Sequence, residues 1–138
     1  MRSPLLFLAG SLVLLGSISE AAEAQRVHEI RLEANAEKEV YRFSPGRVSA
    51  RPGDVLVFKT VSGTPHSIVF EGATLSGPAR EALNGSMGRR SADLSSPLLS
   101  PNGSEYRIVV PALPAGRYEF FCLPHRAYDM RGVLQVTK

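Results

Sequence analysis

Short apolar stretches separated by turn-forming residues run through most of this sequence, and they limit the folds that it can adopt. The chain has 138 residues, of which 12 are Gly and 10 are Pro. Apolar runs of this length with turns between them are typical of strands in an antiparallel β-sandwich or barrel. The stretches expected to form strands are around 30–32 and at 41–43, 55–58, 68–70, 106–110, 118–122 and 133–136. The pattern therefore predicts an all-β fold of about seven or eight strands, connected as a Greek key.

One stretch, 71–104, departs from this pattern because it is rich in Gly, Ser, Pro and Ala. Within it, residues 78–85 are expected to form a short helix, with Pro78 near its start and Gly85 at its end. A second helical turn is expected to begin over 91–94. We interpret 71–104 as a long surface connection that crosses from one sheet to the other.

The N-terminus has the features of a secretory signal peptide. Arg2 gives a positive charge, an apolar run follows at 5–18, and an A-x-A site at 22–24 places cleavage before Gln25. The apolar run of about 14 residues is shorter than the ~20 that a membrane-spanning helix needs. This length favours a cleaved signal peptide, residues 1–24, over a retained membrane anchor.

The remaining residues, 25–138, are expected to form one domain that is exported to the periplasm or, depending on the source, to a thylakoid lumen or the extracellular space. The whole chain has a net charge of +3, and Arg89-Arg90 is its only basic pair, so binding to nucleic acid is not expected. A mildly basic surface serves solubility or steers the chain to an acidic partner. We expect a monomer with no stable insertion into membranes.

Cysteine and histidine are scarce in this chain, which has one Cys and three His. A single cysteine excludes an internal disulfide, and three histidines are too few for a polynuclear centre built on many imidazoles. Cys122, His125 and Met130 lie on one short loop between two expected strands, and His66 stands at the start of another. A thiolate, two imidazoles and a thioether form a soft ligand set that suits copper in both oxidation states.

Other interpretations of these residues remain open. Zinc accepts Cys and His ligands, although structural zinc seldom takes Met. A Cys–His pair also serves as nucleophile and base in enzymes, but no third group that would orient the histidine is evident. A lone buried cysteine is often an inert small apolar residue. We interpret His28 as a surface residue and Met87 as a packing residue.

Several motifs together resemble those of the plastocyanin-like blue copper proteins, the cupredoxin family. They are Cys-x2-His-x4-Met at 122–130, the preceding Tyr-x-Phe-aromatic strand, Pro-His-x-Ile-Val-Phe at 65–70 and the Pro-Gly-Asp turn at 52–54. The resemblance covers nearly all of the chain after the signal peptide and implies a cupredoxin-like sandwich. It also implies one type 1 copper ion, and the ligands that it implies are His66, Cys122, His125 and Met130.

Two positions depart from the pattern of the family. Ser67 stands where the family often has Asn, and its side chain is expected to hydrogen-bond between the two ligand loops. Its backbone N–H is expected near the sulfur of Cys122, where it would tune the potential. Asp129 stands before the axial Met where the family often has Gly, and we expect its carboxylate beside the site, with an effect on the potential or the loop shape.

The resemblance implies a soluble one-electron carrier that cycles between Cu(II) and Cu(I), with no bond-making chemistry. In such proteins the second His ligand, here His125, exposes its ring edge. An apolar patch around it is then expected to dock redox partners briefly, and its members are Pro65, Leu123, Pro124 and Ala127. A copper-binding protein for delivery or storage, without a redox role, remains the alternative.

A second docking point is expected at Phe121. Side chains alternate along a strand, so Tyr118, Phe120 and Cys122 are expected to face the core while Glu119 and Phe121 face solvent. An exposed aromatic ring beside a ligand cysteine is a second possible place of electron entry. An exposed apolar residue without a role is an equally good interpretation.

Overall fold

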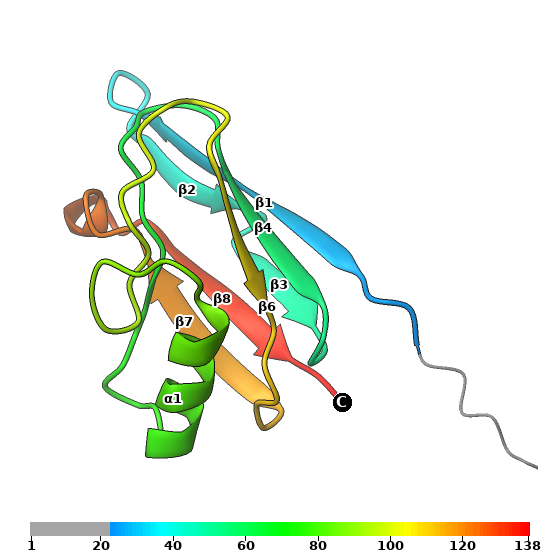
Figure 1. Cartoon of the computed structure of the whole chain (residues 1–138). Helices are drawn as coiled ribbons and strands as arrows, with labels where there is room; N and C mark the ends of the chain where they lie inside the picture. Colours follow the sequence, from blue (N-terminus) through cyan, green and yellow to red (C-terminus); the bar gives the residue numbers. More distant parts are fainter. Residues whose placement is uncertain (1–22) are drawn as a thin grey trace, which may run out of the picture.

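Two four-stranded sheets pack face to face in this computed structural model, which describes residues 23–138 (Figure 1). The first sheet has the spatial order β2 (Val40–Ser44), β1 (Val27–Asn35), β4 (Val55–Thr60) and β6 (Glu105–Val109). The second has the order β3 (Arg47–Ala50), β8 (Arg131–Val136), β7 (Gly116–Phe121) and β5 (Val69–Phe70). The eight-strand β-sandwich confirms the expected fold class. Apart from residues 23 and 24, the expected signal peptide 1–24 lies outside the described residues.

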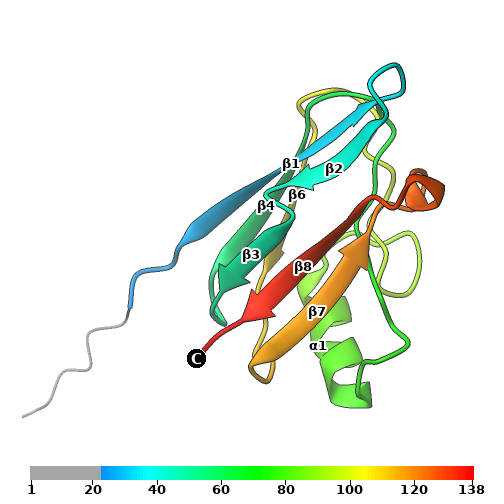
Figure 2. The same ribbon diagram turned by 180° about the vertical axis from the view of Figure 1, so that it is seen from behind.

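Not all strand pairs are antiparallel, and in this respect the sequence-based expectation was wrong. β1 pairs in parallel with β4, and β3 pairs in parallel with β8. The reason is that the chain changes sheets between β2 and β3 and again between β3 and β4, so it returns to β1 in the same direction (Figure 2). Strand β3 was not expected at all, because only Val48 and Ala50 of its four residues are buried and apolar.

Phe120 of β7 lies at the centre of the core that joins the two sheets. Its ring meets the rings of Phe43, Phe58 and Phe70 edge-on, at centroid distances of 4.9, 5.4 and 5.9 Å respectively. Such edge-to-face pairs stabilise beyond the burial of their area. Gly132 of β8 is paired with Phe120 in register, and a Cβ at this glycine would overlap the Phe120 ring. The loop that joins β7 to β8 therefore begins next to this closely packed contact.

The long connection between β5 and β6 crosses between the sheets, as expected, and carries the helix α1 (Gly77–Ser86). Ser76 caps this helix, because its side chain accepts the N–H of Ala79. Two residues of the helix, Ala79 and Leu83, are buried. Met87, which directly follows the helix, is a packing residue and is 1% exposed. Within residues 23–138, no helix has the length and the apolar character needed to cross a membrane.

The second helical turn expected over 91–94 does not form. This segment is a tight turn closed by a bridge between Ala92 and Ser95. Leu94 adopts a left-handed backbone with φ of 54°, which a right-handed helix does not admit. The side-chain oxygen of Asn84, in α1, accepts the N–H of Leu94 at 2.8 Å, so the turn is fastened to the helix that precedes it.

Asp54, in the Pro-Gly-Asp turn before β4, ties the start of β1 to this turn. Its carboxylate accepts the backbone N–H groups of Arg26 and Arg51, both at 3.1 Å, and the Nε2–H of His28 at 3.0 Å. Burial acts to raise the pKa of Asp54, but these hydrogen bonds outweigh it and lower the pKa to about 2. His28 is therefore not a plain surface residue, because its side chain is only 24% exposed and pairs with Asp54.

Candidate metal centre

The loop that follows β7 is closed on itself by backbone hydrogen bonds. The N–H of Cys122 donates to the carbonyl of Met130 at 3.0 Å, and the N–H of Met130 donates to the carbonyl of His125 at 3.4 Å. Between them lies the short 3-10 helix η1 (Arg126–Tyr128). Cys122 directly follows β7, and Met130 directly precedes β8. Because these two strands are paired, the loop over residues 122–130 (the metal loop) begins and ends at fixed positions on the core.

Asp129 allows the loop to turn into β8. It has a left-handed backbone with φ of 57°, a conformation that Gly, Asn and Asp adopt more readily than other residues. Its side chain is 86% exposed and accepts from Arg131 Nε at 2.8 Å. The expectation of a carboxylate at the site was therefore wrong for the side chain, which turns to solvent and a cation, while the backbone of Asp129 does set the loop shape.

His66 reaches the same place from the other side, on the segment between β4 and β5. Its backbone exchanges two hydrogen bonds with Leu99, at 3.1 and 2.8 Å. The preceding Gly63 has φ of 67°, and a Cβ there would overlap the side chain and carbonyl oxygen of Ala34. Only glycine allows this segment to lie so close to β1, and the close approach determines where His66 stands.

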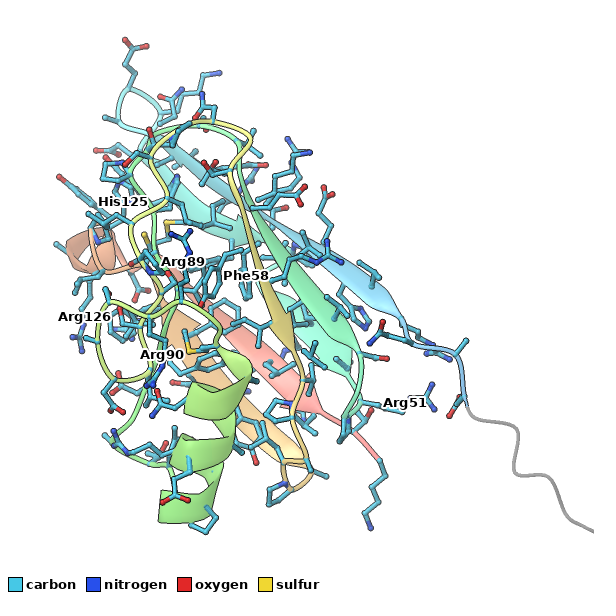
Figure 3. The ribbon with its side chains drawn as sticks, in the orientation of Figure 1. Arg51, Phe58, Arg89, Arg90, His125 and Arg126 are labelled. Carbon is cyan, nitrogen blue, oxygen red and sulfur yellow. The ribbon has the colours of Figure 1, made fainter. Side chains whose placement is uncertain are left out.

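Three donor atoms come together at this end of the sandwich. The Sγ of Cys122 lies 3.6 Å from Nδ1 of His66 and 3.5 Å from Nδ1 of His125. Within residues 23–138 these side chains are the group of three that could hold a metal, with their ligand atoms all within 4.8 Å of one another. Cys122 and His66 are fully buried, and His125 is partly exposed. Figure 3 shows His125 at the end of the sandwich that bears the metal loop.

These spacings fit a metal ion held by two nitrogens and a sulfur. With metal–nitrogen bonds of about 2.0 Å and metal–sulfur bonds of about 2.3 Å, bond angles near 110–120° place nitrogen and sulfur about 3.5–3.7 Å apart. Both observed nitrogen–sulfur distances are in or at the edge of this interval. The donor set of thiol and imidazole also suits copper.

A hydrogen bond fixes the orientation of the His66 ring. Its Nε2–H donates to the backbone carbonyl of Ser62 at 2.7 Å. Because Nε2 carries the proton in the neutral ring, Nδ1 keeps its lone pair and points it at the sulfur of Cys122. Ser62 therefore selects the tautomer that a metal requires at this histidine.

Burial favours the neutral forms of all three donors. It lowers the pKa of His66, although the Ser62 carbonyl acts in the opposite direction, and it lowers the pKa of His125, with a further contribution from His66. Burial raises the pKa of the Cys122 thiol, although hydrogen bonds from Ser67 and His125 act to lower it. Metal binding must therefore displace the thiol proton.

Ser67 joins the two loops that carry the donors. Its hydroxyl accepts the backbone N–H of Leu123 at 3.1 Å, so the expected hydrogen bond between the loops is confirmed. The backbone and side chain of Ser67 also act to lower the pKa of the Cys122 thiol, but burial outweighs them and the net shift is upward. Met130, the fourth residue indicated by the sequence, is fully buried beside this loop and its backbone closes it.

The surface around His125 is apolar and hollowed. Pro65, Leu123 and Pro124 are exposed, Leu123 to 55%. An open groove of about 410 Å³ lies against His125. The residues that line the groove are Ala34, Ala36, Tyr41, Gly63, Thr64, Pro65, Pro124, His125 and Tyr128.

Phe121 does not face solvent, which corrects the expectation from strand alternation. Its side chain is only 5% exposed. The guanidinium of Arg126 covers the ring, and Arg131 approaches it as well. Tyr118, Phe120 and Cys122 are buried, as expected. The alternation rule failed at Phe121 because the long side chain of Arg126, in η1, lies over its ring and that of Arg131, in β8, approaches it.

Sequence reasoning missed four residues that shape this site. Ser62 acts through its backbone carbonyl, which no side-chain pattern reports. Gly63 was visible as a glycine three residues before a histidine, but its contact with β1 depends on the fold. Tyr41 and Tyr128 are far apart in the sequence and meet beside His125.

Comparison with known proteins agrees with this geometry. Residues 30–137 match the family model of copper binding proteins, plastocyanin/azurin family. Plastocyanin of Vicia faba is 32% identical over 98 residues, covering 69% of this chain and 87% of the relative. Plastocyanin of Nostoc punctiforme is 24% identical over 125 residues, covering 91% of this chain and 86% of the relative.

The fold is similar to that of solved plastocyanins. The oxidized form of plastocyanin from Dryopteris crassirhizoma superposes with a TM-score of 0.62 at 24% identity, covering 80% of this chain and all of the solved chain. The family match, the fold and the donor cluster agree that the cofactor is one copper ion of the type 1 kind. The chain therefore belongs to the plastocyanin/azurin family of copper-binding proteins.

Proposed function

We propose that this chain is an exported one-electron carrier, in which His66, Cys122 and His125 would be the strong ligands of copper and Met130 a weak fourth ligand. The observation that carries the proposal is the convergence of Nδ1 of His66, Sγ of Cys122 and Nδ1 of His125 at one buried point. Export rests on the signal-peptide features of the sequence.

The protein contributes a rigid arrangement of donors. Copper bound there supplies a one-electron couple, and a soft ligand set of this kind suits both of its oxidation states. Cys122 directly follows the core strand β7, His66 is held by Leu99 and Ser62, and Ser67 ties the two loops together. Because these contacts fix Cys122 and His66 from outside the site, little of this part of the protein has to move when the charge changes.

A carrier is favoured over an enzyme with a cysteine nucleophile. Cys122 is fully buried, and burial raises the pKa of its thiol, whereas a nucleophilic cysteine needs access and a lowered pKa. The groove beside His125 is lined by that histidine and not by the cysteine. A substrate in the groove would therefore meet an imidazole edge, not the thiol.

Redox partners are proposed to dock on the apolar patch formed by Pro65, Leu123 and Pro124 around His125. All three are exposed next to the one donor residue that is not fully buried. Small apolar interfaces suit brief encounters. Phe121 is not proposed as a second docking point, because Arg126 covers its ring.

The test is the spectrum and voltammetry of the copper-loaded chain from Gln25 onward. A carrier is expected to show an intense visible thiolate-to-Cu(II) band and a reversible one-electron wave, and Cys122→Ser is expected to lose the band. A colourless Cu(II) form would overturn the type 1 site. A blue protein that never cycles, yet hands its copper to a metal-free acceptor, would instead indicate copper delivery.

A further inference from the structure

His125 lacks the hydrogen bond that orients the other histidine. His66 is fixed through Nε2 by the carbonyl of Ser62 at 2.7 Å. In the described part of the chain, Nε2 of His125 has no hydrogen-bond partner, and its Nδ1 faces Cys122 at 3.5 Å. Metal-binding histidines usually have their second nitrogen held, so packing contacts must orient this ring instead.

Outside the donor cluster, and within the described residues, His125 contacts one aromatic ring, that of Tyr41. Tyr41 lies on β2, in the sheet opposite to the one that carries His125, and its ring centroid is 5.4 Å from that of His125, at an angle of 41°. The His66 ring is 4.9 Å from the His125 ring, at 53°. The His125 ring therefore has two aromatic neighbours, Tyr41 and His66.

Tyr41 is itself stacked on the loop that carries His125. The rings of Tyr41 and Tyr128 lie almost parallel, at an angle of 9°, with centroids 4.1 Å apart. Tyr128 ends η1 and is 58% exposed, so core burial does not explain its place. Figure 2 shows η1 at the ends of β7 and β8, beside β2 and the β1–β2 turn.

The turn η1 has few other attachments. None of its residues is buried. Arg126 fastens one end of it toward β7, through the Phe121 ring at 4.3 Å and Glu71 at 3.7 Å. Tyr128 fastens the other end to Tyr41, and thus to the opposite sheet. Without the stack, His125 would be connected to β2 only through the contact of its own ring with Tyr41.

We propose that the Tyr41–Tyr128 stack is a clamp that fastens the metal loop to β2 and so sets the orientation of the His125 ring toward Cys122. The two tyrosines are positioning residues, not ligands. The proposal deepens the proposed copper site and rests on it, but the clamp is made of protein contacts alone.

The first test is amide hydrogen exchange of residues 124–130 in the metal-free protein. Tyr41→Leu and Tyr128→Leu are expected to speed exchange there by about two- to tenfold, the range for one lost aromatic pair. The double variant is expected to match Tyr41→Leu, because Tyr41→Leu already removes the stack together with the contact between Tyr41 and His125. Tyr41→Phe and Tyr128→Phe keep the stack and are expected to exchange like the parent protein.

Leu83→Ala is the matched control, because it weakens α1 at a buried residue outside the metal loop. If Leu83→Ala speeds exchange over 124–130 as much as Tyr41→Leu does, the effect is global unfolding and the clamp is refuted. Additive effects of the two tyrosine substitutions would also refute it.

The second test uses the copper-loaded protein. Tyr41→Leu and Tyr128→Leu are expected to broaden or shift the visible band and the electron paramagnetic resonance spectrum, and Tyr41→Phe is expected to restore both. Unchanged spectra in the leucine variants would overturn the role in orienting His125. If the parent protein has no type 1 spectrum, the proposed function fails, while the exchange experiment still decides whether the clamp exists.

Discussion

Arg126 lies over the ring of Phe121, with its guanidinium carbon 4.3 Å from the ring centroid. The same guanidinium is 3.7 Å from the carboxylate of Glu71, so the arginine is held in place from both sides. A cation over an aromatic face is favourable, by about 0.5–1 kcal/mol where it is partly exposed. The contact covers the side chain of Phe121, the last residue of β7, which Cys122 directly follows.

Replacing Arg126 by alanine is expected to lower the free energy of unfolding by about 1 kcal/mol and to expose Phe121, while the visible band of the copper-loaded protein stays unchanged. Urea unfolding and the absorption spectrum are the measurements. Arg47→Ala, an exposed arginine on β3, is the control and is expected to change stability by less than about 0.5 kcal/mol. Equal losses in the two variants would count against the contact.

The fold could be predicted from the sequence because its signal is local. Alternating apolar residues and turns indicated every strand except β3, and Pro78 with Gly85 indicated the helix that forms at Gly77–Ser86. Parallel pairing of β1 with β4 depends on how the chain crosses between sheets, and short strands leave that undetermined. β3 has too few apolar residues to be recognised alone.

The donor residues could also be proposed from the sequence, since three of them share one loop and the fourth precedes a strand. What surrounds them could not. The position of the Ser62 carbonyl and the close approach of the Gly63 backbone to Ala34 are created by the fold. Phe121 was misplaced because a strand pattern describes the strand itself and not the arginine that folds over it.

Acid is expected to weaken the fold partly through Asp54. The pKa of its carboxyl in the folded protein is about 2, below its ordinary value of 3.8. A lowered pKa stabilises the fold above the unfolded value, so this contribution is complete above about pH 5 and is lost as the pH falls toward 2. Asp54→Asn keeps the shape and removes the charge, and it is expected to flatten the pH dependence of stability between pH 5 and 2.

Urea unfolding of the metal-free protein at several pH values measures this effect without interference from copper ligands. The slope that Asp54 adds is at most about 1.4 kcal/mol per pH unit. Because other acidic groups titrate in the same interval, the difference between the parent protein and Asp54→Asn is the quantity to compare. Parallel curves for the two proteins would show that Asp54 does not contribute.

Gly63→Ala is expected to destabilise the chain by about 2–4 kcal/mol, because it combines a left-handed backbone with an overlap on Ala34. Since this segment positions His66, the variant is also expected to bind copper more weakly. Chemical unfolding and a copper titration measure the two effects. An unchanged free energy of unfolding in Gly63→Ala would show that the segment can move away from β1 at little energetic cost.

Gly85→Ala provides a control of opposite sign. Gly85 lies in α1, has no positive φ, and a Cβ there meets nothing within 4 Å. Alanine at such a helical position is expected to stabilise by about 0.5–1 kcal/mol. A loss of stability in both variants would mean that added methyl groups disturb this protein generally, not that Gly63 has a special place.

Met130→Leu tests whether Met130 is a copper ligand or only a core residue. Met130 is fully buried and its backbone bonds to Cys122 and His125, so leucine of similar volume is expected to cost less than about 1.5 kcal/mol of stability. If the thioether is a weak axial ligand, its loss removes a donor that favours Cu(II), and the reduction potential is expected to rise while the visible band persists.

Voltammetry measures the potential. The control is Met87→Leu, at a second buried methionine next to the end of α1, and it is expected to leave the potential unchanged. A potential that stays the same in both variants would assign Met130 to packing alone, and a potential that rises in both would trace the effect to the core instead of to the ligand.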